Sequence, residues 1–218
     1  MNSKCSVSLV LALAGLGLSL FSVAASAQSL TLEQLRKAGE LGFCTEVGYP
    51  PFEFFPEGSK DPEGFDIDLA RELARRLGVK ARFDNTGFDG IIAALLAKKC
   101  DVVISALSQT PARQEQVNFV LYLQNNRALV VRKGNPRQVS RFDALCGLTV
   151  GAQIGSANYD DVNKLSDKCK SEGKPTLSVR SFKDASALKL ALLTNQIDAY
   201  NTARWYIFCL RLSTPPSC

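Results

Sequence analysis

The chain has 218 residues, of which 46% are apolar and 22% are charged, and its formal net charge is +5. These values are ordinary for a globular protein, and they exclude a disordered tail, a collagen-like fibre and a polytopic membrane protein. The sequence contains no histidine, which removes Ser-His-Asp and Cys-His catalytic pairs and His-ligated zinc. Lysine and arginine form no block, so we expect no nucleic-acid partner.

The first 27 residues have the pattern of a cleaved export signal. Lys4 supplies the positive start, residues 7–23 are uncharged and largely apolar, and Ala25-Ser26-Ala27 offers the small residues that signal peptidase accepts. A retained membrane anchor is the alternative, but serines and glycines dilute the apolar run. We therefore expect residues 1–27 to be a signal peptide and the exported, mature chain to begin near Gln28.

Export changes how the cysteines are interpreted. Six of them follow residue 27, and an oxidising compartment favours disulfides over free thiols or zinc. Cys146 and Cys169 bracket a strand-and-helix pattern, whereas Cys44 and Cys100 each sit in or beside a predicted strand. These are the two candidate pairs, although six cysteines allow many connectivities and unpaired buried thiols are the alternative.

The residues from 41 to 104 alternate between strand and helix patterns. Phe65, Leu69, Leu73 and Leu77 recur every four residues, which predicts a helix with these four side chains inside and Gly78 as its cap. Asp89 is interpreted as the cap of a second helix. The predicted elements are strand 41–45, helix 64–77, strand 79–83, helix 88–96 and strand 102–104. A βαβαβ order of this kind predicts a parallel sheet.

The alternation then restarts, with strands at 128–131, 148–151, 177–179 and 197–200 and helices at 156–170 and 184–193. Residues 94–101 and 191–198 echo each other, because in each a helix end leads through a polar turn into Asp and a strand. The restart predicts two α/β lobes, residues 28–125 and 126–203.

A cleft between two such lobes is where a small ligand binds, at the carboxyl ends of the strands. Residues 105–113 follow one of these strands and supply two serines, a run of backbone amides and Arg113 one helical turn on. Backbone amides, together with a guanidinium that can form two parallel hydrogen bonds, are suited to bind a carboxylate. Residues 155–158 could present further amides from the second lobe. For both segments an ordinary helix cap is the alternative.

At these residues the chain resembles a known family, the periplasmic polar-amino-acid-binding proteins of ABC importers. The resemblance rests on the order of six loose motifs between about Leu41 and Tyr200: Tyr49-Pro50-Pro51-Phe52, Gly64-Phe65-Asp66-Ile67-Asp68-Leu69, Phe88-Asp89-Gly90-Ile91-Ile92, Lys99-Cys100-Asp101, Thr110-Pro111-Ala112-Arg113 and Gly134-Asn135-Pro136. It implies a two-lobed α/β fold of the periplasmic-binding-protein type II. It also implies a monomeric binder without a cofactor, which delivers an amino acid to an ABC permease in the inner membrane.

The resemblance also implies roles for particular residues. Arg113 would hold the carboxylate of the ligand with the amides of Ser108 and Ala157, and Ser105 and Ser108 would lie near the α-ammonium. Tyr49 and Phe88 would sandwich the ligand side chain. Glu46 would pair with a distal cation, the alternative being a solvated loop carboxylate. The expected ligand-binding residues are thus Glu46, Tyr49, Phe88, Ser105, Ser108, Arg113, Ser156 and Ala157.

The end of the chain departs from the family pattern. Relatives place an aspartate five residues after the position of Asp198, to pair with the ligand ammonium, and this chain has Ala203 there. Residues 204–218 do not resemble the family sequence. We expect a frameshift or truncation near residue 202, which would leave the second lobe and the hinge return incomplete and could impair binding. A shortened but functional variant is the alternative.

Two other functions stay open from sequence alone. Some relatives of these binders are exported dehydratases, for which Glu46, Asp89 or Asp101 would be candidate acids, but no two carboxylates stand at a recognisable catalytic spacing. A sensory or accessory binding module would use the same cleft with a different partner. We expect a binding protein and not an enzyme.

Overall fold

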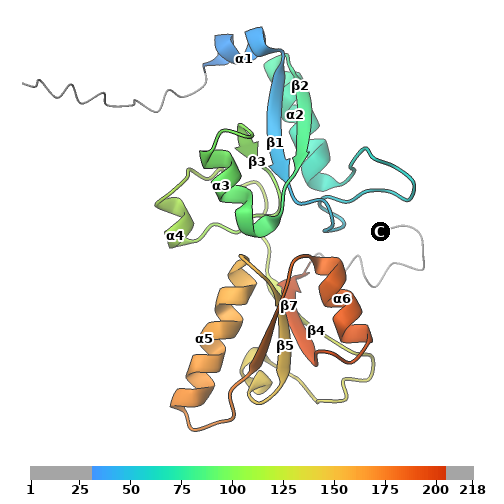
Figure 1. Ribbon diagram of the computed structural model, residues 1–218, viewed down its shortest axis with the longest axis vertical. Helices are drawn as coiled ribbons and strands as arrows, with labels where there is room; N and C mark the ends of the chain where they lie inside the picture. The colour runs from blue at the N-terminus through green and yellow to red at the C-terminus, as the bar shows by residue number, and fades with distance from the viewer. Residues whose placement is uncertain (1–30, 205–218) are drawn as a thin grey trace, which may run out of the picture. The chain divides into compact units, whose positions relative to one another are not determined.

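The computed structural model describes residues 31–204, which contain two separate β-sheets with helices packed against them (Figure 1). The predicted signal peptide lies outside the described residues. So do residues 205–218 of the predicted tail, which include Cys209 and Cys218. The division of the chain into lobes at residue 125 stays a prediction.

The first sheet is parallel and has the strand order β2-β1-β3. Its strands are β1 (Glu40–Thr45), β2 (Lys80–Asn85) and β3 (Val102–Val103). The helices around it are α1 (Leu32–Ala38), α2 (Phe65–Leu77), the 3₁₀ turn η1 (Phe88–Gly90), α3 (Ile91–Leu96) and α4 (Pro111–Gln114). The predicted βαβαβ order is therefore present, and α1 is an additional helix that the sequence analysis did not predict.

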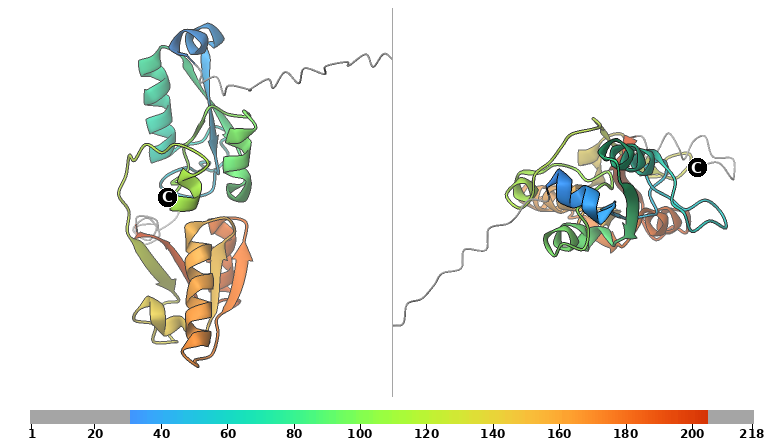
Figure 2. Two further views of the ribbon diagram at one scale, coloured as in Figure 1. Left: turned by 90° about the vertical axis from the view of Figure 1, so that its left-hand side faces the viewer. Right: turned by 90° about the horizontal axis from the view of Figure 1, so that it is seen from above.

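Successive residues of β1 face opposite sides of this sheet, and both sides are covered. Phe43 packs into a cluster with Ala70 and Ala74 of α2, whereas Cys44 packs with Ile91 and the rest of the α3 cluster. Figures 1 and 2 show α2 and α3 on either side of β1. A strand that is buried on both faces reads as a continuous apolar run, which is why 41–45 could be recognised as a strand.

The predicted inner face of α2 is wrong in part. Phe65 and Leu73 are 45% and 39% exposed, and the buried positions of the helix are Asp66, Ile67, Ala70 and Ala74. A repeat of exactly four residues drifts around a helix with 3.6 residues per turn, so the four predicted side chains do not share one face. The small alanines let α2 approach the sheet closely.

The predicted helix over 88–96 is two elements, η1 and α3. Asp89 lies inside η1, and the cap positions are Gly87 and Gly90, neither of which has a capping side chain. The interpretation of Asp89 as a helix cap is therefore wrong.

The second sheet is mixed, with the strand order β4-β7-β5-β6. Its strands are β4 (Arg127–Val131), β5 (Thr149–Gln153), β6 (Ser178–Phe182) and β7 (Ala199–Ala203), and its helices are η2 (Phe142–Leu145), α5 (Ala157–Ser171) and α6 (Ala185–Leu193). The pairs β5–β6 and β5–β7 are parallel, but β4 runs antiparallel to β7. The second half therefore repeats the first only in its parallel part.

Helices cover both faces of this second sheet as well. Val150 and Ala152 of β5 face the cluster that contains Val162 of α5, while Gly151 between them faces α6. A Cβ on Gly151 would lie 2.6 Å from Cδ1 of Ile197 and 2.7 Å from Cδ2 of Leu188. Glycine at this position is what allows α6 to pack directly on the sheet.

Both candidate cysteine pairs are disulfides in the structure. Cys44 is bonded to Cys100 and Cys146 to Cys169. The first bond ties β1 to the turn before β3, and the second ties the end of η2 to the last turns of α5. Each links segments that are separated in sequence, by 56 and 23 residues, so each restricts the unfolded chain.

The echo between residues 94–101 and 191–198 has a structural counterpart. The amide of Asp101 donates to the carbonyl of Gly42, and the amide of Gly42 donates to the Asp101 carboxylate at 2.8 Å. Asp198 makes the same two bonds with Thr149, at 2.7 and 3.0 Å. Each aspartate fastens the turn after a helix to the start of a central parallel strand.

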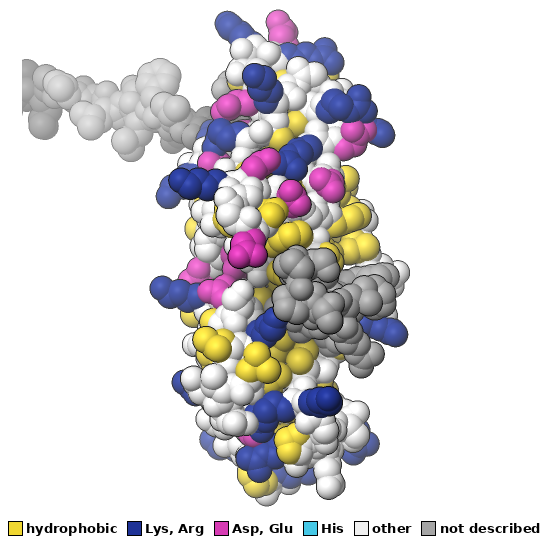
Figure 3. Space-filling model, turned by 90° about the vertical axis from the view of Figure 1, so that its right-hand side faces the viewer, with side chains coloured by type: hydrophobic (Ala, Val, Ile, Leu, Met, Phe, Trp, Pro, Cys, Tyr) yellow, Lys and Arg dark blue, Asp and Glu magenta, His cyan; other side chains and the backbone are white. Residues whose placement is uncertain are grey.

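Several large apolar side chains of the described residues are exposed, among them Val120 at 88% and Leu121 at 71%. Figure 3 shows one face on which hydrophobic side chains gather between lysines and arginines. None of the helices within residues 31–204 is both long and apolar enough to cross a bilayer.

Candidate functional site

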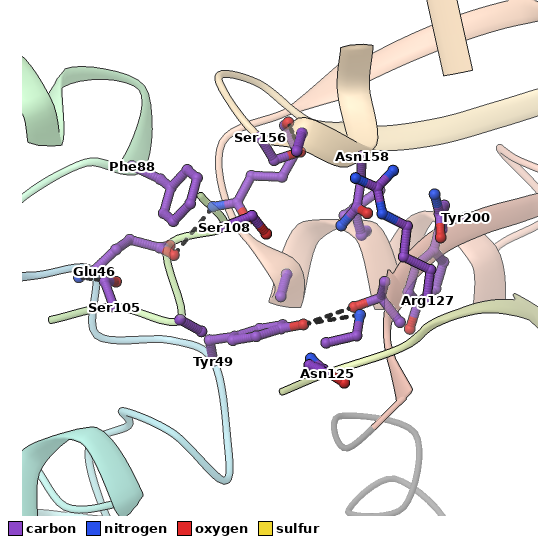
Figure 4. Close-up of a pocket in the computed structure, with 18 of the residues that line it drawn as sticks. Glu46, Tyr49, Phe88, Ser105, Ser108, Asn125, Arg127, Ser156, Asn158 and Tyr200 are labelled. Atoms are coloured by element: carbon purple, nitrogen blue, oxygen red, sulfur yellow. Dashed lines mark hydrogen bonds between the residues drawn. The ribbon is translucent and has the colours of Figure 1, made fainter. Parts of the chain in front are cut away.

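One pocket brings together all eight ligand-binding residues that the sequence predicts (Figure 4). It is lined from the first sheet by residues that follow β1 and β3, and from the second sheet by the carboxyl ends of β5 and β7 and the first turns of α5 and α6. The rule that ligands bind beyond the carboxyl ends of strands therefore located the pocket correctly.

Arg113 is held in the pocket from both halves of the chain. It lies in the short helix α4, whose N-cap Thr110 accepts a hydrogen bond from the Arg113 amide. Its Nη1 donates to the carbonyl of Ser108 at 2.6 Å, and its Nη2 donates to the carbonyl of Gly155 at 2.7 Å. The guanidinium also lies 5.9 Å from the centroid of the Phe88 ring. Burial lowers the pKa of Arg113, an effect that Asp160 opposes.

The first turn of α5 faces this guanidinium across the pocket. Ser156 caps the helix, because its Oγ accepts from the Tyr159 amide at 3.1 Å and donates to the Gln153 carbonyl at 2.6 Å. Ala157 is the first helical residue and also lines the pocket. The segment is thus both a helix cap and part of the pocket wall, and the positive end of the α5 dipole favours an anion there.

Gly155 permits a close approach between the two halves. Its φ is +74°, in the left-handed region, and a Cβ there would lie 2.7 Å from Cα of Asp89. Any other residue would meet both an unfavourable backbone conformation and the main chain of η1. Gly155 therefore sets how closely its own carbonyl, which accepts from Arg113, can approach the first half of the chain.

Tyr49 spans the pocket from the loop after β1. Its ring stacks on Phe52, with 5.6 Å between centroids. Its hydroxyl forms a hydrogen bond of 2.9 Å with Oγ1 of Thr202 and accepts from the Ala203 amide at 3.2 Å. Burial raises the pKa of Tyr49 to about 12, so the phenol is neutral and keeps its proton for these contacts.

Glu46 is buried, at 8% exposure, so its interpretation as a solvated loop carboxylate is wrong. Its Oε2 accepts from Nε2 of Gln153 at 3.0 Å, and Nε2 also donates to the carbonyl of Lys183. Burial raises the pKa of Glu46 to about 7; the bond from Gln153 lowers it, and the nearby Asp184 raises it further. In Figure 4 the Glu46 carboxylate is drawn between the rings of Phe88 and Tyr49.

Ser105 forms the floor of the pocket beside Glu46. Its Oγ accepts from the Glu46 amide at 3.0 Å and donates to Oε1 of Glu53 at 2.8 Å. Ser105 and Glu53 are both almost fully buried. The serine therefore links the pocket to a deeper acidic side chain that the sequence analysis did not single out.

The sequence analysis missed most of the polar side chains that the second half contributes. Gln153 and Asn201 stand at or near the carboxyl ends of β5 and β7, so the strand-end rule could have found them. Arg127 is a second arginine on the wall, ion-paired with Asp161, and burial lowers its pKa. Arg127 is the first residue of β4, and the strand-end rule considers only the carboxyl ends of strands. The remaining missed wall residues are Glu53, Asn125, Asn126, Ala185, Leu188, Tyr200 and Thr202. Ala106, Asn158 and Ala203 also line the pocket and stand in segments or at a position that the sequence analysis had placed there.

Of the three residues considered as catalytic acids, Glu46 lines the pocket, and Asp89 and Asp101 do not. Asp101 fastens the start of β1, as described above, and is not among the residues that line the pocket. Asp89 lies in η1, which packs against Gly155. Among residues 31–204 no three or more Cys, Asp or Glu side chains come together as a metal site.

Comparison with known proteins identifies the family. The model of the bacterial extracellular solute-binding proteins, family 3, matches residues 41–202. The chain belongs to this family. It has the α/β periplasmic binding protein fold, with the two sheets described above.

Three relatives show the range of similarity. An L-cystine-binding protein of Escherichia coli (strain K12) is 33% identical over 141 residues, which are 64% of this chain and 52% of that protein. The lysine/arginine/ornithine-binding periplasmic protein of the same strain is 38% identical over 55% of this chain and 46% of its own length. An ancestral arginine-binding protein bound to arginine is 37% identical, with a TM-score of 0.72, over 79% of this chain and 73% of its own. All three are named as binding proteins.

The chain spans about half the length of the curated relatives that it matches.

Gly155→Ala tests the close approach of the two halves. We expect a loss of stability of roughly 1–2 kcal/mol from the left-handed backbone, and a further loss from the contact with Asp89. Gly173→Ala is the matched control, because Gly173 has φ +69° and nothing within 4 Å of an added Cβ. Urea unfolding of both variants measures the difference. Equal losses in the two variants would show that the contact with Asp89 contributes nothing.

Proposed function

We propose that this chain is a periplasmic solute-binding protein which captures a polar amino acid in the pocket and delivers it to an ABC permease. The observation that carries the proposal is the position of Arg113, a partly buried cation fixed by one carbonyl from each half of the chain. Membership of the solute-binding family supports both the export and the permease partner.

The carboxylate of the ligand would bind at Arg113. A guanidinium has five N–H donors in a planar fork, and the hydrogen bonds found among the described residues use two of its nitrogens, Nη1 and Nη2, once each. Donors therefore remain for a carboxylate. The amides of Ser108 and Ala157 and the dipole of α5 favour negative charge at the same place. Arg113 has no carboxylate partner among its hydrogen bonds, and a bound amino acid would supply one.

The side chain of the ligand would lie between Tyr49 and Phe88 and end at Glu46. Aromatic faces attract a cation or an aliphatic stem, and Glu46 with the amide oxygen of Gln153 offers acceptors at the far end. A lysine- or arginine-like side chain satisfies both. The similarity to proteins that are named for lysine, arginine and ornithine supports this choice.

The ammonium of the ligand would have a weaker partner than in the family pattern. Ala203 stands where an aspartate is expected, and it lines the pocket beside Thr202 and the Tyr49 hydroxyl. Neutral hydroxyl and carbonyl oxygens would then accept from the ammonium. A charge-assisted hydrogen bond contributes about 1.5–3 kcal/mol, so the affinity should be lower than that of a relative with the acid.

Arg113→Ala should weaken binding of L-arginine by about a hundredfold or more, because it removes the partner of the ligand carboxylate. Arg113→Lys keeps the charge but not the planar fork and should recover only part of the loss. Isothermal titration calorimetry measures both, with Arg75→Ala, an exposed arginine paired to Glu72, as the control. Unchanged affinity in Arg113→Ala would refute the proposed carboxylate site.

Ala203→Asp should tighten amino-acid binding by about tenfold or more, because it adds the charged partner for the ammonium. The same titration measures the gain, and Ala203→Asn is the matched control of similar shape without the charge. If both variants bound alike, the ammonium would not lie at this end of the pocket.

The affinity for L-arginine should depend on pH through Glu46. The free protein holds a proton on Glu46 below about pH 7, and a cationic side chain prefers the ionised form, so affinity should rise as pH increases from about 6 to 8. Affinity for the neutral L-glutamine should not rise. Titrations of the wild type and of Glu46→Gln at several pH values test this. A slope that survives in Glu46→Gln would assign the effect to another group.

A further inference from the structure

A pair of acids, one of which lines the pocket, stands outside the set of residues to which the ligand was assigned. Glu53 follows the Tyr49 turn and is 1% exposed, and Asp66 is the second residue of α2 and is 0% exposed. The two carboxyl groups are neighbours: Glu53 accepts from Ser105, and Asp66 accepts from the next residue, Ala106. The Asp66 amide also donates to the carbonyl of Phe52, directly before Glu53. Two ionised carboxylates in such contact, both shielded from water, would repel each other strongly.

Three hydrogen-bond donors from other residues contact the two carboxyl groups. Oε1 of Glu53 accepts from the Ser105 hydroxyl at 2.8 Å. Oδ2 of Asp66 accepts from the Ala106 amide at 2.7 Å and from the Tyr122 hydroxyl at 2.9 Å. The remaining oxygens, Oε2 of Glu53 and Oδ1 of Asp66, are buried and have no donor from another residue.

A single proton satisfies both of these oxygens. If Oε2 of Glu53 carries it, the O–H donates to Oδ1 of Asp66, and every carboxyl oxygen of the pair then has a partner. Asp66 is the better site for the negative charge, because it already accepts from two donors. Glu53 has only the Ser105 hydroxyl, so the proton belongs on Glu53.

The charges around the pair favour the same state. The groups that face Glu53 are Asp66 from α2, Ser105 after β3, and Glu46 and Tyr49 after β1, and Tyr122 faces Asp66. All are acidic or neutral, and the hydrogen bonds that the described residues give to the two acids come from Ser105, Ala106 and Tyr122, with no lysine or arginine among them. Burial raises the pKa of Glu53 well above its usual range, and Asp66 raises it further. Burial also raises the pKa of Asp66, against the bonds from Ala106 and Tyr122.

We propose that Glu53 and Asp66 share one proton at neutral pH and that this pair positions the pocket floor through Ser105 and Ala106. Protonated Glu53 fixes the Ser105 hydroxyl, which in turn accepts from the Glu46 amide. Ionised Asp66 holds the amide of Ala106, a residue with φ +45° whose left-handed backbone needs such a restraint. Both acids are therefore positioning residues for the site, and their roles do not require that the ligand be an amino acid.

Infrared spectroscopy of the ligand-free protein tests the shared proton. The test uses Glu46→Gln as the parent protein, because Glu46 is also buried and its pKa of about 7 would add a second protonated acid. At neutral pH this parent should show the C=O stretching band of a protonated, buried carboxylic acid. Adding Glu53→Gln should abolish the band, because its amide replaces the acid and donates to Asp66 in the same way. Adding Glu57→Gln, at an exposed acid, should retain it. Absence of the band from the Glu46→Gln parent, or its persistence after Glu53→Gln is added, would overturn the proposal.

Hydrogen exchange of the Glu46 amide, followed by NMR, tests the positioning role. Glu53→Gln should leave the exchange rate near that of the wild type, whereas Glu53→Ala should accelerate it about tenfold, the effect of one lost hydrogen bond. Ser105→Ala should accelerate exchange of the Glu46 amide equally while keeping the infrared band. If Glu53→Ala does not fold, the exchange rate in Ser105→Ala tests the positioning role. Equal rates in the wild type and Ser105→Ala would overturn the role of the serine.

Discussion

The site depends on one interaction, the fixation of the Arg113 guanidinium between the carbonyls of Ser108 and Gly155. Carbonyl dipoles hold the cation in place without neutralising it, so the pocket keeps a positive charge that a carboxylate can bind. Since the two carbonyls come from segments that follow β3 and β5, the same interaction also joins the two halves of the chain. Binding of an anion and contact between the halves are therefore coupled at one side chain.

The other contacts across the pocket constrain the same geometry. Tyr49 reaches Thr202, Glu46 reaches Gln153, and Gly155 approaches Asp89 without a side chain between them. Each pair contains one residue from the first half and one from the second. A ligand that fits between the halves would thus meet acceptors from Glu46 at one end and donors from Arg113 at the other, which is the polarity of an amino acid with a cationic side chain.

The sequence was sufficient to predict those features that depend on the local pattern of residues. An apolar run predicted β1, and Ser156 and Asp184 predicted the starts of α5 and α6. Strand ends, together with the family resemblance, predicted eight of the residues that line the pocket. The proposed roles of those residues stay predictions.

Features that depend on long-range packing could not be predicted in this way. The face of α2 that is buried follows from its alanines against β1, and the pattern of large side chains gave a face that is wrong at Phe65 and Leu73. The antiparallel pairing of β4 leaves no local signal. Glu53 stands in an aromatic run and Asp66 in a first helical turn, where acids are ordinarily solvated, so their burial against each other becomes evident only when α2 is placed beside the Tyr49 turn.

A crystal structure of the chain with bound L-arginine tests the central claim most directly. The account requires the ligand carboxylate within hydrogen-bonding distance of the Arg113 guanidinium and the ligand side chain directed between Tyr49 and Phe88 toward Glu46. A ligand bound in the reverse orientation, or one bound away from Arg113, would contradict it.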